Sequence, residues 1–499
     1  MLNTILKWSI AQRWLVVIGA IVVTVLGSYN LTRMPLDVFP DFAPPQVEIQ
    51  TEAPGLAPEE VESLVTLPIE SAVNGTPGVE TVRSSSAVGI SVVRVIFNWG
   101  TDVYQARQLV TERLQQVRSK LPASIETPQI SPITSPIGTI LMYAFSVESA
   151  VRSQGETASS TSLMEVRRFV DRDVTNRLLA VPGISQVIAY GGDVRQYQVL
   201  VDPVKLAAFD VELADVTEAA EQANVNAAGG FLITPDQEEV IRGVGRIESI
   251  EQLAQSVVTT RDGKPILLQD VASVQIGAAL QRGDGSANGN RAVVVVVNKQ
   301  PLADTPTVTR AVERAMEELK VGLPQDVRVV ETFRQNSFIE SAIENVRNSL
   351  RDGIIIVSIV LLMFLMNWRT AVITLSAIPL SILIGMLILS WFGQGINTMT
   401  LGGLAVAIGS VVDDSIVDME NCYRGLRKNQ VSDQPKHPFQ IVYDTSVEVR
   451  VSVIFSTVII AVVFAPIFTL TGVEGRIFAP MGIAYLISIL ASTFVAMTL

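Results

Sequence analysis

The chain of 499 residues divides into long apolar runs and one extended stretch of ordinary globular composition. Six apolar runs reach or approach the length of a membrane-spanning helix, which needs about 20 mainly apolar residues. These runs are Trp14–Leu31, Gly353–Trp368, Ala371–Gly393, Thr398–Tyr423, Val449–Leu470 and Phe478–Leu499. The last run has no polar exit, so we expect the chain to be cut within a helix. The pattern predicts an α-helical transmembrane bundle with a large domain between its first two spans.

The stretch between these two spans repeats one order of strand and helix patterns. The first set is Val47–Thr51 (strand), Ala57–Asn74 (helix), Gly78–Ser85 and Ile90–Asn98 (strands) and Asp102–Leu121 (helix). The second set is Ile140–Val147 (strand), Ser162–Ala180 (helix), Ile184–Tyr190 and Gln196–Asp202 (strands), Arg291–Asn298 (strand) and Asp304–Val321 (helix). Matching Pro-Gly turns, Thr76–Val79 and Val181–Ile184, indicate a duplicated unit. We therefore predict an α+β region of two ferredoxin-like (split βαβ) modules packed side by side.

Two segments depart from this pattern. Met34–Pro45 is rich in proline and is predicted to be an extended connector. About Pro203–Gln275 is predicted to be an insertion, and within it Asn224–Arg242 has too little apolar periodicity for a buried element. Such a segment fits a glycine-hinged arm that docks into a neighbouring subunit, and an ordinary exposed hairpin is the alternative. The candidate docking residues are Phe231, Leu232 and Ile233.

These elements predict the domain organisation. The amino-terminal segment and first span precede a first outer module, a second module interrupted by the docking insertion, and a membrane block. That block begins with an amphipathic approach helix, Ser337–Asp352. The predicted segments are 1–33, 34–135 (first module), 136–202 (second module, first part), 203–275 (insertion), 276–336 (second module, remainder) and 337–499 (approach helix and remaining spans).

Basic residues predict the orientation of the spans. Lys7 and Arg13 precede the first span, Arg369 lies between the second and third, and the polar loop Arg424–Glu448 follows the fourth. These positions lie on one side if every run spans, which makes the amino terminus cytoplasmic and places the large domain outside. A cleaved signal peptide is the alternative for the first run. Its long apolar core and the absence of a small-x-small site at Leu31–Pro35 favour an uncleaved anchor.

Composition excludes several classes of function. The net charge of −12 argues against nucleic-acid binding. Cys422 is the only cysteine and His437 the only histidine, and both are predicted to be cytoplasmic. The outer domain therefore has neither a disulfide nor a Cys/His metal site. No GxxxxGK[ST] motif is present, so ATP binding by a P-loop is excluded. We expect no resident cofactor and no enzymatic activity.

The fourth run carries four carboxylates: Asp413, Asp414, Asp418 and Glu420. One acidic residue at the centre of a membrane helix costs roughly 2.5–3.5 kcal/mol on insertion scales, so such residues usually have a function. Two adjacent carboxylates in a low-dielectric bundle cannot both ionise cheaply, and at least one should bind and release a proton near neutral pH. Asp413 and Asp414 are therefore the main candidates for a proton relay. Asp418 and Glu420 lie nearer the interface, where simple hydrated carboxylates are an alternative.

The counter-charge for these acids is not evident. No lysine or arginine lies well inside a predicted span, so we expect the basic partner in a further segment or in another subunit.

The motif GxVVDDSIVDMEN, at Gly409–Asn421, resembles the fourth-helix signature of resistance-nodulation-division (RND) efflux pumps. The connector PLDVFPDF and the entry NTMTLGGLAVAIG resemble the same family, and the resemblance covers essentially the whole chain as the amino-terminal half of such a pump. Two further stretches, Asp444–Arg450 and Ile467–Phe478, resemble the heavy-metal branch, with its copper/silver and cobalt/zinc/cadmium types. Met399 falls where the copper/silver type has a membrane methionine of its proposed metal relay.

Two positions depart from the heavy-metal pattern. Ala407 stands where the cobalt/zinc type has an additional aspartate, and Asp414 gives the paired aspartates of drug exporters. Export of amphiphilic organic compounds or drugs therefore remains an alternative to export of heavy-metal cations. A membrane-anchored scaffold or receptor with structural acids is the third possibility.

The resemblance implies proton-driven export by alternating access, with Asp413 and Asp414 as the proton relay and Glu420 assisting. It also implies a homotrimer whose arm docks into the adjacent subunit. A periplasmic adaptor protein and an outer-membrane channel are the implied partners. The implied location is the bacterial inner membrane, with several passes and a large periplasmic domain.

Overall fold

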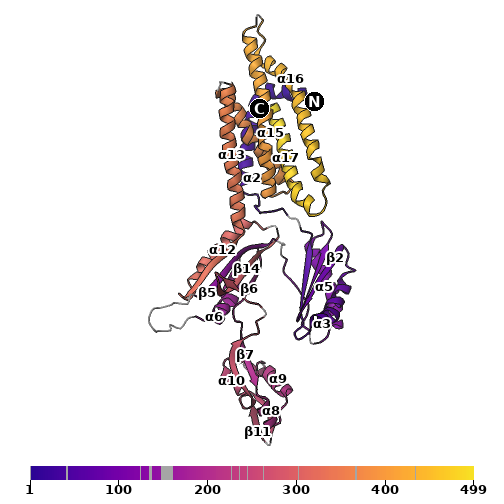
Figure 1. Cartoon of the computed structure of the whole chain (residues 1–499), viewed down its shortest axis with the longest axis vertical. Helices are drawn as coiled ribbons and strands as arrows, with labels where there is room; N and C mark the ends of the chain where they lie inside the picture. The colour runs from indigo at the N-terminus through magenta and orange to yellow at the C-terminus, as the bar shows by residue number, and fades with distance from the viewer. Residues whose placement is uncertain are drawn as a thin grey trace.

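The computed structural model shows a long helical block that leads into two α/β modules and then a smaller subdomain (Figure 1). The amino terminus lies at the end of the helical block away from the modules, which we call the distal end; the opposite end of the block is the proximal end. The structure describes residues 2–40, 43–123, 125–133, 137–147, 161–225, 227–234, 237–243, 245–261, 263–281, 283–301, 303–365, 368–432 and 434–498.

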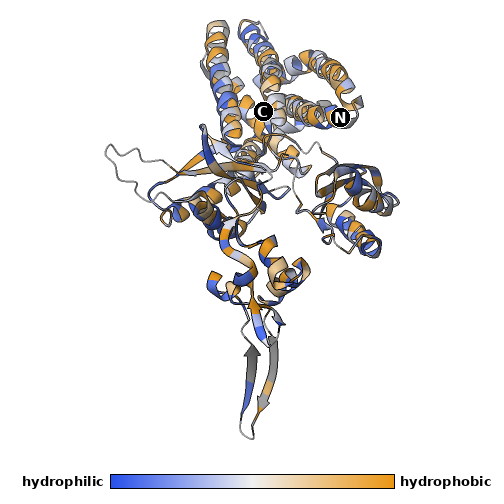
Figure 2. Ribbon diagram, turned by 60° about the horizontal axis from the view of Figure 1, so that its bottom comes forward, coloured by the Kyte–Doolittle hydropathy of each residue, from blue (hydrophilic) through white to orange (hydrophobic). Residues whose placement is uncertain are grey.

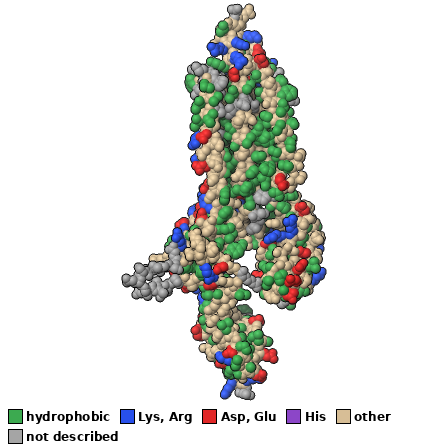
Figure 3. Space-filling view, viewed as in Figure 1, with side chains coloured by type: hydrophobic (Ala, Val, Ile, Leu, Met, Phe, Trp, Pro, Cys, Tyr) green, Lys and Arg blue, Asp and Glu red, His purple; other side chains and the backbone are tan. Residues whose placement is uncertain are grey.

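The helical block is built from apolar helices preceded by the short helix α1 (Leu2–Ala11). Its long helices are α2 (Arg13–Leu31), α13 (Asn336–Leu365), α14 (Trp368–Trp391), α15 (Thr398–Gln430), α16 (Pro438–Phe464) and α17 (Gly472–Thr498). Among the described residues, five helices are long and apolar enough to cross a membrane, namely α2, α14, α15, α16 and α17. Hydrophobic side chains cover the visible face of the block, and charged groups gather at its distal end and over the modules (Figure 3).

Most of the second predicted span, Gly353–Trp368, lies in α13, which ends at Leu365, whereas Trp368 is the first residue of α14. Helix α13 runs for 30 residues from the second module into the block, so the approach helix and most of the span form one continuous element. The predicted polar loop Arg424–Glu448 is wrong in its extent, because α15 continues to Gln430 and α16 already begins at Pro438. Proline is favoured at the first helical position, where its missing N–H is not needed, so Pro438 starts a helix rather than only breaking one.

The first module is a four-stranded antiparallel sheet with the order β2-β3-β1-β4. Two helical segments pack on the sheet, and Val65, Ile69 and Val110 are fully buried in the core between them. The strands are β1 (Gln46–Glu52), β2 (Val79–Ala87), β3 (Ile90–Phe97) and β4 (Gln129–Ile130). The helical segments are α3 (Pro58–Val61), the π turn η1 (Glu62–Thr66) and α4 (Leu67–Val73), then α5 (Val103–Val117) and η2 (Arg118–Lys120).

The second module repeats this arrangement. Its main strands lie in the order β6-β14-β5-β15, which matches the first sheet strand for strand, and β13 (Ser286–Ala287) adds to β14. The strands are β5 (Thr139–Val147), β6 (Ile184–Tyr190), β14 (Asn290–Lys299) and β15 (Val327–Arg334). The helices are α6 (Leu163–Phe169), the π turn η3 (Val170–Val174), α7 (Thr175–Leu179) and α12 (Thr305–Lys320). The turn glycines Gly78 and Gly183 both have positive φ, which explains the repeated Pro-Gly motif.

The insertion leaves the second sheet after β6 and returns before β13. Its stem is the antiparallel ribbon of β7 (Arg195–Val201) and β12 (Ala272–Ala278). The strand predicted at Gln196–Asp202 is therefore present, but it pairs with β12 instead of joining the second sheet. Beyond the stem lies a small core that includes Val216, Leu253 and Leu268. Its other elements are α8 (Pro203–Phe209), α9 (Leu213–Gln222), α10 (Ile250–Ala254), β10 (Val257–Arg261), β11 (Lys264–Leu267) and α11 (Leu268–Val271).

An extended hairpin projects from this subdomain, away from the rest of the chain (Figure 2). It pairs β8 (Ala227–Ile233) with β9 (Glu238–Gly243) and contains a register shift between Ala228 and Phe231. Phe231 and Ile233 are 63% and 77% exposed. The side chain of Leu232 lies outside the described part of the chain. Two exposed apolar side chains on a projecting hairpin agree with the predicted docking arm and equally with the alternative of an ordinary exposed hairpin.

Candidate functional site

The acidic helix α15 begins at a well-formed cap. The Asn397 side chain accepts hydrogen bonds from the backbone N–H groups of Met399 and Thr400, at 3.0 and 2.9 Å. In return the Thr400 hydroxyl accepts from the Asn397 N–H at 2.8 Å. This reciprocal cap satisfies N–H groups that a helix start otherwise leaves unpaired. It fixes the proximal end of the helix.

Asp413 and Asp414 lie near the midpoint of the 33-residue helix α15. Their backbone is helical, but their side chains lie outside the described part of the structure. The predicted relay pair is thus placed in the interior of a candidate membrane helix.

Close packing against α17 surrounds this pair on its proximal side. A Cβ atom at Gly403 would lie 2.3 Å from the Met481 carbonyl oxygen, so only glycine permits this approach. One turn further, Ala407 is 1% exposed. Hydroxyl groups follow: Ser410 and Tyr485 lie within hydrogen-bond distance at 3.3 Å, and the Ser492 hydroxyl donates to the Val411 carbonyl at 3.1 Å. Hydroxyl side chains of α15 and α17 therefore lie next to the acidic positions.

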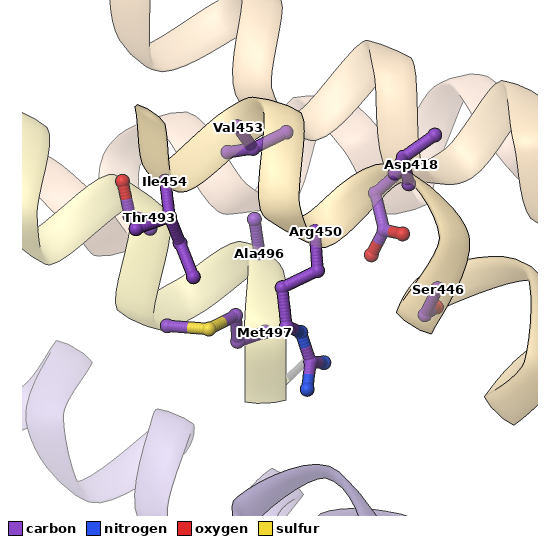
Figure 4. A pocket seen from close by; sticks show the side chains of 9 residues that line it. Asp418, Ser446, Arg450, Val453, Ile454, Thr493, Ala496 and Met497 are labelled. Atoms are coloured by element: carbon purple, nitrogen blue, oxygen red, sulfur yellow. The ribbon is translucent and has the colours of Figure 1, made fainter. Parts of the chain in front are cut away.

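A second polar group lies on the distal side of the pair, between α15, α16 and α17 (Figure 4). Asp418 of α15 accepts a hydrogen bond from the Ser446 hydroxyl and interacts electrostatically with Arg450 of α16. Ser446 and Arg450 are only 4% and 7% exposed. We call these three residues the Asp418 cluster. They line a cavity of about 20 Å³ together with Val449, Val453, Ile454, Thr493, Ala496 and Met497.

Further polar contacts extend the cluster toward the distal end. The Cys422 sulfur lies 3.2 Å from the Ser446 hydroxyl oxygen, and the Thr445 hydroxyl lies 3.5 Å from the same sulfur. The Asn421 amide donates to the Thr445 carbonyl at 2.9 Å. The helices α15 and α16 are therefore joined by side-chain hydrogen bonds as well as by apolar packing.

Arg450 is a basic residue that the apolar pattern placed at the edge of a predicted span, Val449–Leu470. It sits near the midpoint of α16, and its helix is one of the candidate spans. The apolar run that marked this span begins only at Val449, so the hydropathy pattern assigned the first turns of the helix to a loop. The start signal at Pro438 was present and would have located Arg450 within the helix.

Glu420 is placed differently from Asp418. It is about half exposed and forms an ion pair with Arg424, one turn along α15, at 2.5 Å. The structure thus includes Asp418 in the buried group and leaves Glu420 on the surface of the described chain.

Met399, the candidate metal residue, lies half-buried in the first turn of α15. It is about 21 Å from Asp413 along the helix axis at 1.5 Å per residue. No group of three or more His, Cys, Asp or Glu side chains arranged to hold a metal ion occurs within the described residues.

A junction connects the helical block with the second module. Leu36 of the connector pairs with Ile396, and the Thr398 hydroxyl donates to the Val38 carbonyl at 2.7 Å, so the connector lies against the start of α15. The next connector residue, Asp37, forms an ion pair with Lys299 at the end of β14. Lys299 is 2% exposed and also donates to the Ala303 carbonyl at 3.0 Å.

A cavity of about 430 Å³ adjoins this junction, and its lining includes Asp37, Asn397 and Arg476. The Arg476 guanidinium, near the start of α17, lies 4.4 Å from the centroid of the Trp99 ring in the first module. The start of α15 therefore contacts the connector, which is paired with the second module through Asp37, and the start of α17 contacts the first module directly.

Comparison with known proteins gives a consistent result. The sequence is 35% identical to Protein HelA of Legionella pneumophila, over 100% of this chain and 47% of that protein. It is 34% identical to the cation efflux system protein CusA of Escherichia coli, over 96% of this chain and 46% of that protein. A crystal structure of a heavy metal efflux pump superposes with a TM-score of 0.85 at 29% identity, covering 99% of this chain and 47% of that one.

The chain spans about half the length of the curated relatives it matches. The sequence pattern of the AcrB/AcrD/AcrF family matches residues 5–499. This match, like the relatives above, extends over nearly all of the sequence. The chain therefore belongs to the AcrB/AcrD/AcrF family of RND permeases.

Proposed function

We propose that this chain is part of a proton-motive-force-driven transporter that exports heavy-metal cations by alternating access. The observation that carries the proposal is the position of Asp413 and Asp414 at the midpoint of α15, within a block of apolar helices. Acidic residues inside a membrane helix raise the free energy of insertion and usually have a function. Two adjacent acids in such a place provide a group that binds and releases a proton as the machine turns over.

Two contacts connect this proton site with the modules. α15 packs on α17 without a gap at Gly403, so the two helices shift together. The start of α15 is bonded to the connector, whose Asp37 reaches Lys299 in the second module. The start of α17 reaches Trp99 in the first module through Arg476. A change of charge at Asp413 or Asp414 that moves the helix pair is thereby passed to both modules.

The modules would act as porter domains. Their shared strand order, 2-3-1-4 in each sheet, supports the ferredoxin-like topology expected from the sequence. Alternate opening of the space between them would release substrate outward. The chain would lie in the inner membrane with its modules in the periplasm, and the proton gradient would supply the energy without a resident cofactor.

The proposed assembly is a homotrimer, with the arm of β8 and β9 docked in the adjacent subunit. Exposed Phe231 and Ile233 support this role, because apolar groups on a projecting element favour burial against a partner. A periplasmic adaptor protein and an outer-membrane channel would complete the export route.

Heavy-metal cations are the proposed substrate because the similar proteins include a cation efflux protein and heavy metal efflux pumps. Met399 at the proximal end of α15 offers a thioether ligand, which suits soft cations such as Cu⁺ and Ag⁺. The alternative substrate class is amphiphilic organic compounds. It is favoured by Ala407 and by the paired aspartates.

The test is transport by the intact protein in vesicles under an imposed pH gradient, with Ag⁺, Zn²⁺ and an organic dye as separate substrates. We expect Asp414→Asn to reduce Ag⁺ or Zn²⁺ flux to the background of protein-free vesicles. Glu448→Gln, an exposed carboxylate on α16, is the matched control and should keep the flux. Proton-driven flux in Asp414→Asn would contradict the coupling proposal, and flux of the dye alone would contradict the metal assignment.

A membrane-anchored scaffold or receptor predicts a different result. In that case neither Asp414→Asn nor the pH gradient changes the distribution of any substrate.

A further inference from the structure

The Asp418 cluster contains a fixed positive charge inside the helical block. Arg450 is 7% exposed, and its guanidinium does not lose its proton in proteins. Removing such a charge from water costs several kcal/mol unless an anion and hydrogen bonds compensate for it. The Asp418 carboxylate of α15 interacts electrostatically with Arg450 across the interface of α15 and α16. Stability alone does not explain this ion pair, because two apolar residues of similar size at these positions would avoid the free-energy cost of removing charges from water.

Asp418 is itself incompletely satisfied. Its Oδ1 atom is buried and has no hydrogen-bond partner, although the carboxylate accepts from Ser446. An unsatisfied buried oxygen is costly, unless water or a proton occupies it. The adjoining cavity encloses about 20 Å³, which is enough for one water molecule, and it is bordered by Asp418, Arg450 and Thr493 (Figure 4). Asp418 therefore has an unpartnered oxygen and borders a cavity large enough for one water molecule.

The cluster is also well placed relative to the main acids. Asp418 follows Asp414 by four residues, so the two share a face of α15 at a Cβ separation of roughly 5–6 Å. It lies on the distal side, between the midpoint of the helix and the loop that joins α15 to α16. Asp418 is the next carboxylate along α15 in that direction.

We propose that Asp418 is a second proton-exchange station and that Arg450 sets the pH range in which it and the Asp413–Asp414 pair exchange protons. The proposal rests on the proton-driven function above. In the step, the O–H bond of a protonated acid at 413 or 414 breaks and an O–H bond at Asp418 Oδ1 forms, with one water in between. The proton then passes to water at the distal end, and no other reactant is consumed.

Several other charged and titratable groups lie near the cluster. Cys422 of α15 shares Ser446 with Asp418. On α16, Glu448 and Asp444 are exposed, and from α17 the cavity is lined by the uncharged residues Thr493, Ala496 and Met497. Glu420 is paired with Arg424, and Lys7 of α1 lies over the Tyr443 ring at 5.3 Å. Arg450 is therefore the buried basic group of the cluster among the described residues.

The charges predict opposite effects of two substitutions on the pH profile of transport. Arg450→Gln removes a positive charge, so nearby carboxylates hold protons more firmly and the profile should move to higher pH by about one unit. Asp418→Asn removes a negative charge and should move the profile to lower pH by a similar amount. The double variant restores the net charge and should return the profile close to that of the unsubstituted protein.

The experiment measures Ag⁺ or Zn²⁺ flux by the intact transporter in vesicles across a series of external pH values. Arg427→Gln, an exposed arginine on α15, and Glu448→Gln are matched controls and should leave the profile unchanged. Arg450→Lys keeps the charge and should keep the profile even if the maximal rate falls. A purely structural role would lower the rate in both single variants without moving the profile.

Opposite shifts that cancel in the double variant support the proposal. Unshifted profiles, or shifts in the same direction, overturn it while the proton-driven function stands. If the unsubstituted protein transports without any dependence on the pH gradient, the proposed function itself fails. Should Arg450→Gln not fold, infrared difference spectra of the unsubstituted protein and of Asp418→Asn provide the second readout. The proposal requires that Asp418→Asn remove part of the protonated-carboxyl band, and an unchanged band overturns the proposal.

Discussion

Lys299 is charged although only 2% of it is exposed, and its partner Asp37 is 31% exposed. Breaking a buried pair by removing one partner is strongly destabilising, whereas surface pairs contribute little. We expect Lys299→Ala to lower the free energy of unfolding by roughly 2–3 kcal/mol, below the range for a fully buried pair because water reaches Asp37. Urea unfolding of the chain in detergent measures the difference.

The matched control for this prediction is Lys320→Ala. Lys320 pairs with Glu317 on α12, and both side chains are largely exposed. Its loss should change the free energy of unfolding by less than about 0.5 kcal/mol. Equal effects of the two substitutions would show that the junction pair is no stronger than a surface pair.

Tyr143 gives a pH-dependent prediction at the same scale. Burial of its ring raises the pKa of the phenol above the ordinary value of 10.0, and the nearby Glu331 and Glu313 raise it further. The folded pKa exceeds the unfolded one, so this contribution to stability is complete below pH 10 and is lost as pH rises through the folded pKa. Tyr143→Phe should therefore reduce the loss of stability above pH 10.

Thermal unfolding at a series of alkaline pH values measures this effect. Tyr104→Phe is the control, because Tyr104 is 73% exposed and its phenol meets water before and after unfolding. A loss of stability above pH 10 that Tyr143→Phe leaves unchanged would contradict the assignment.

At the residue scale, the position of the acidic residues along α15 could be predicted from the sequence, whereas their contacts with neighbouring helices could not. The acids Asp413 and Asp414 stand out because they interrupt an apolar run, and the structure places them at the midpoint of α15. Asp418 and Glu420 differ in burial because Asp418 contacts α16, whereas Glu420 pairs with a residue of its own helix. The packing of α15 against α16 is a tertiary contact, so the sequence pattern of α15 alone does not reveal this difference. Arg450 was missed because its helix begins before the apolar run does.

At the scale of elements, the contact of α15 with α17 depends on a single missing side chain. A Cβ at Gly403 would lie 2.3 Å from a backbone oxygen, whereas a Cβ at the adjacent Gly402 would meet nothing within 4 Å. We expect Gly403→Ala to cost about 1–3 kcal/mol of stability through overpacking. Gly402→Ala should be neutral or slightly stabilising in the 499-residue chain, because alanine favours a helix.

Melting temperatures of the two variants in one detergent compare them directly. Equal melting temperatures would mean that α15 and α17 separate at no cost, which would also weaken the proposed coupling between proton site and modules.

Element prediction was most successful for the two sheets. Alternating apolar residues and the Pro-Gly turns located three of the four main strands of each sheet and the helices that pack on them, because these signals are local. The last strand of each sheet, β4 and β15, was not predicted. The predicted placement of β7 in the second sheet was wrong. This strand pairs with β12, which lies far from it in the sequence, and local patterns do not reveal such a partner. The short helix α1 was not predicted at all, because its pattern merges with the start of the first apolar run.

At the scale of the whole molecule, the arm is the clearest candidate for contact between subunits. Phe231→Ser with Ile233→Ser should lower the fraction of trimer without unfolding the monomer, because both side chains are exposed in the single chain. Val321→Ser, at an 88% exposed position beyond α12, is the control and should leave assembly unchanged. Native mass spectrometry of the intact transporter counts the subunits, and an undiminished trimer would contradict docking through the arm.

The overall architecture followed from the sequence because segregated hydropathy separates a block of long apolar helices from a region of ordinary globular composition. The segment order and the acidic motif then pointed to the family that the comparisons establish. The contacts between subunits and the exported substrate could not be predicted from the sequence in the same way. They depend on surfaces that meet only in the assembly, and hydropathy patterns do not encode which surfaces meet.

The two ends of the insertion meet closely at Gly191 and Gly285. A Cβ at Gly191 would lie 2.4 Å from the Gly285 backbone nitrogen, so the backbone enters and leaves the second sheet at nearly one point. A segment attached in this way can be gained, lost or exchanged without reshaping the sheet that carries it. Evolution could therefore alter the arm and the subdomain that carries it without altering the sheet to which both ends of the segment return.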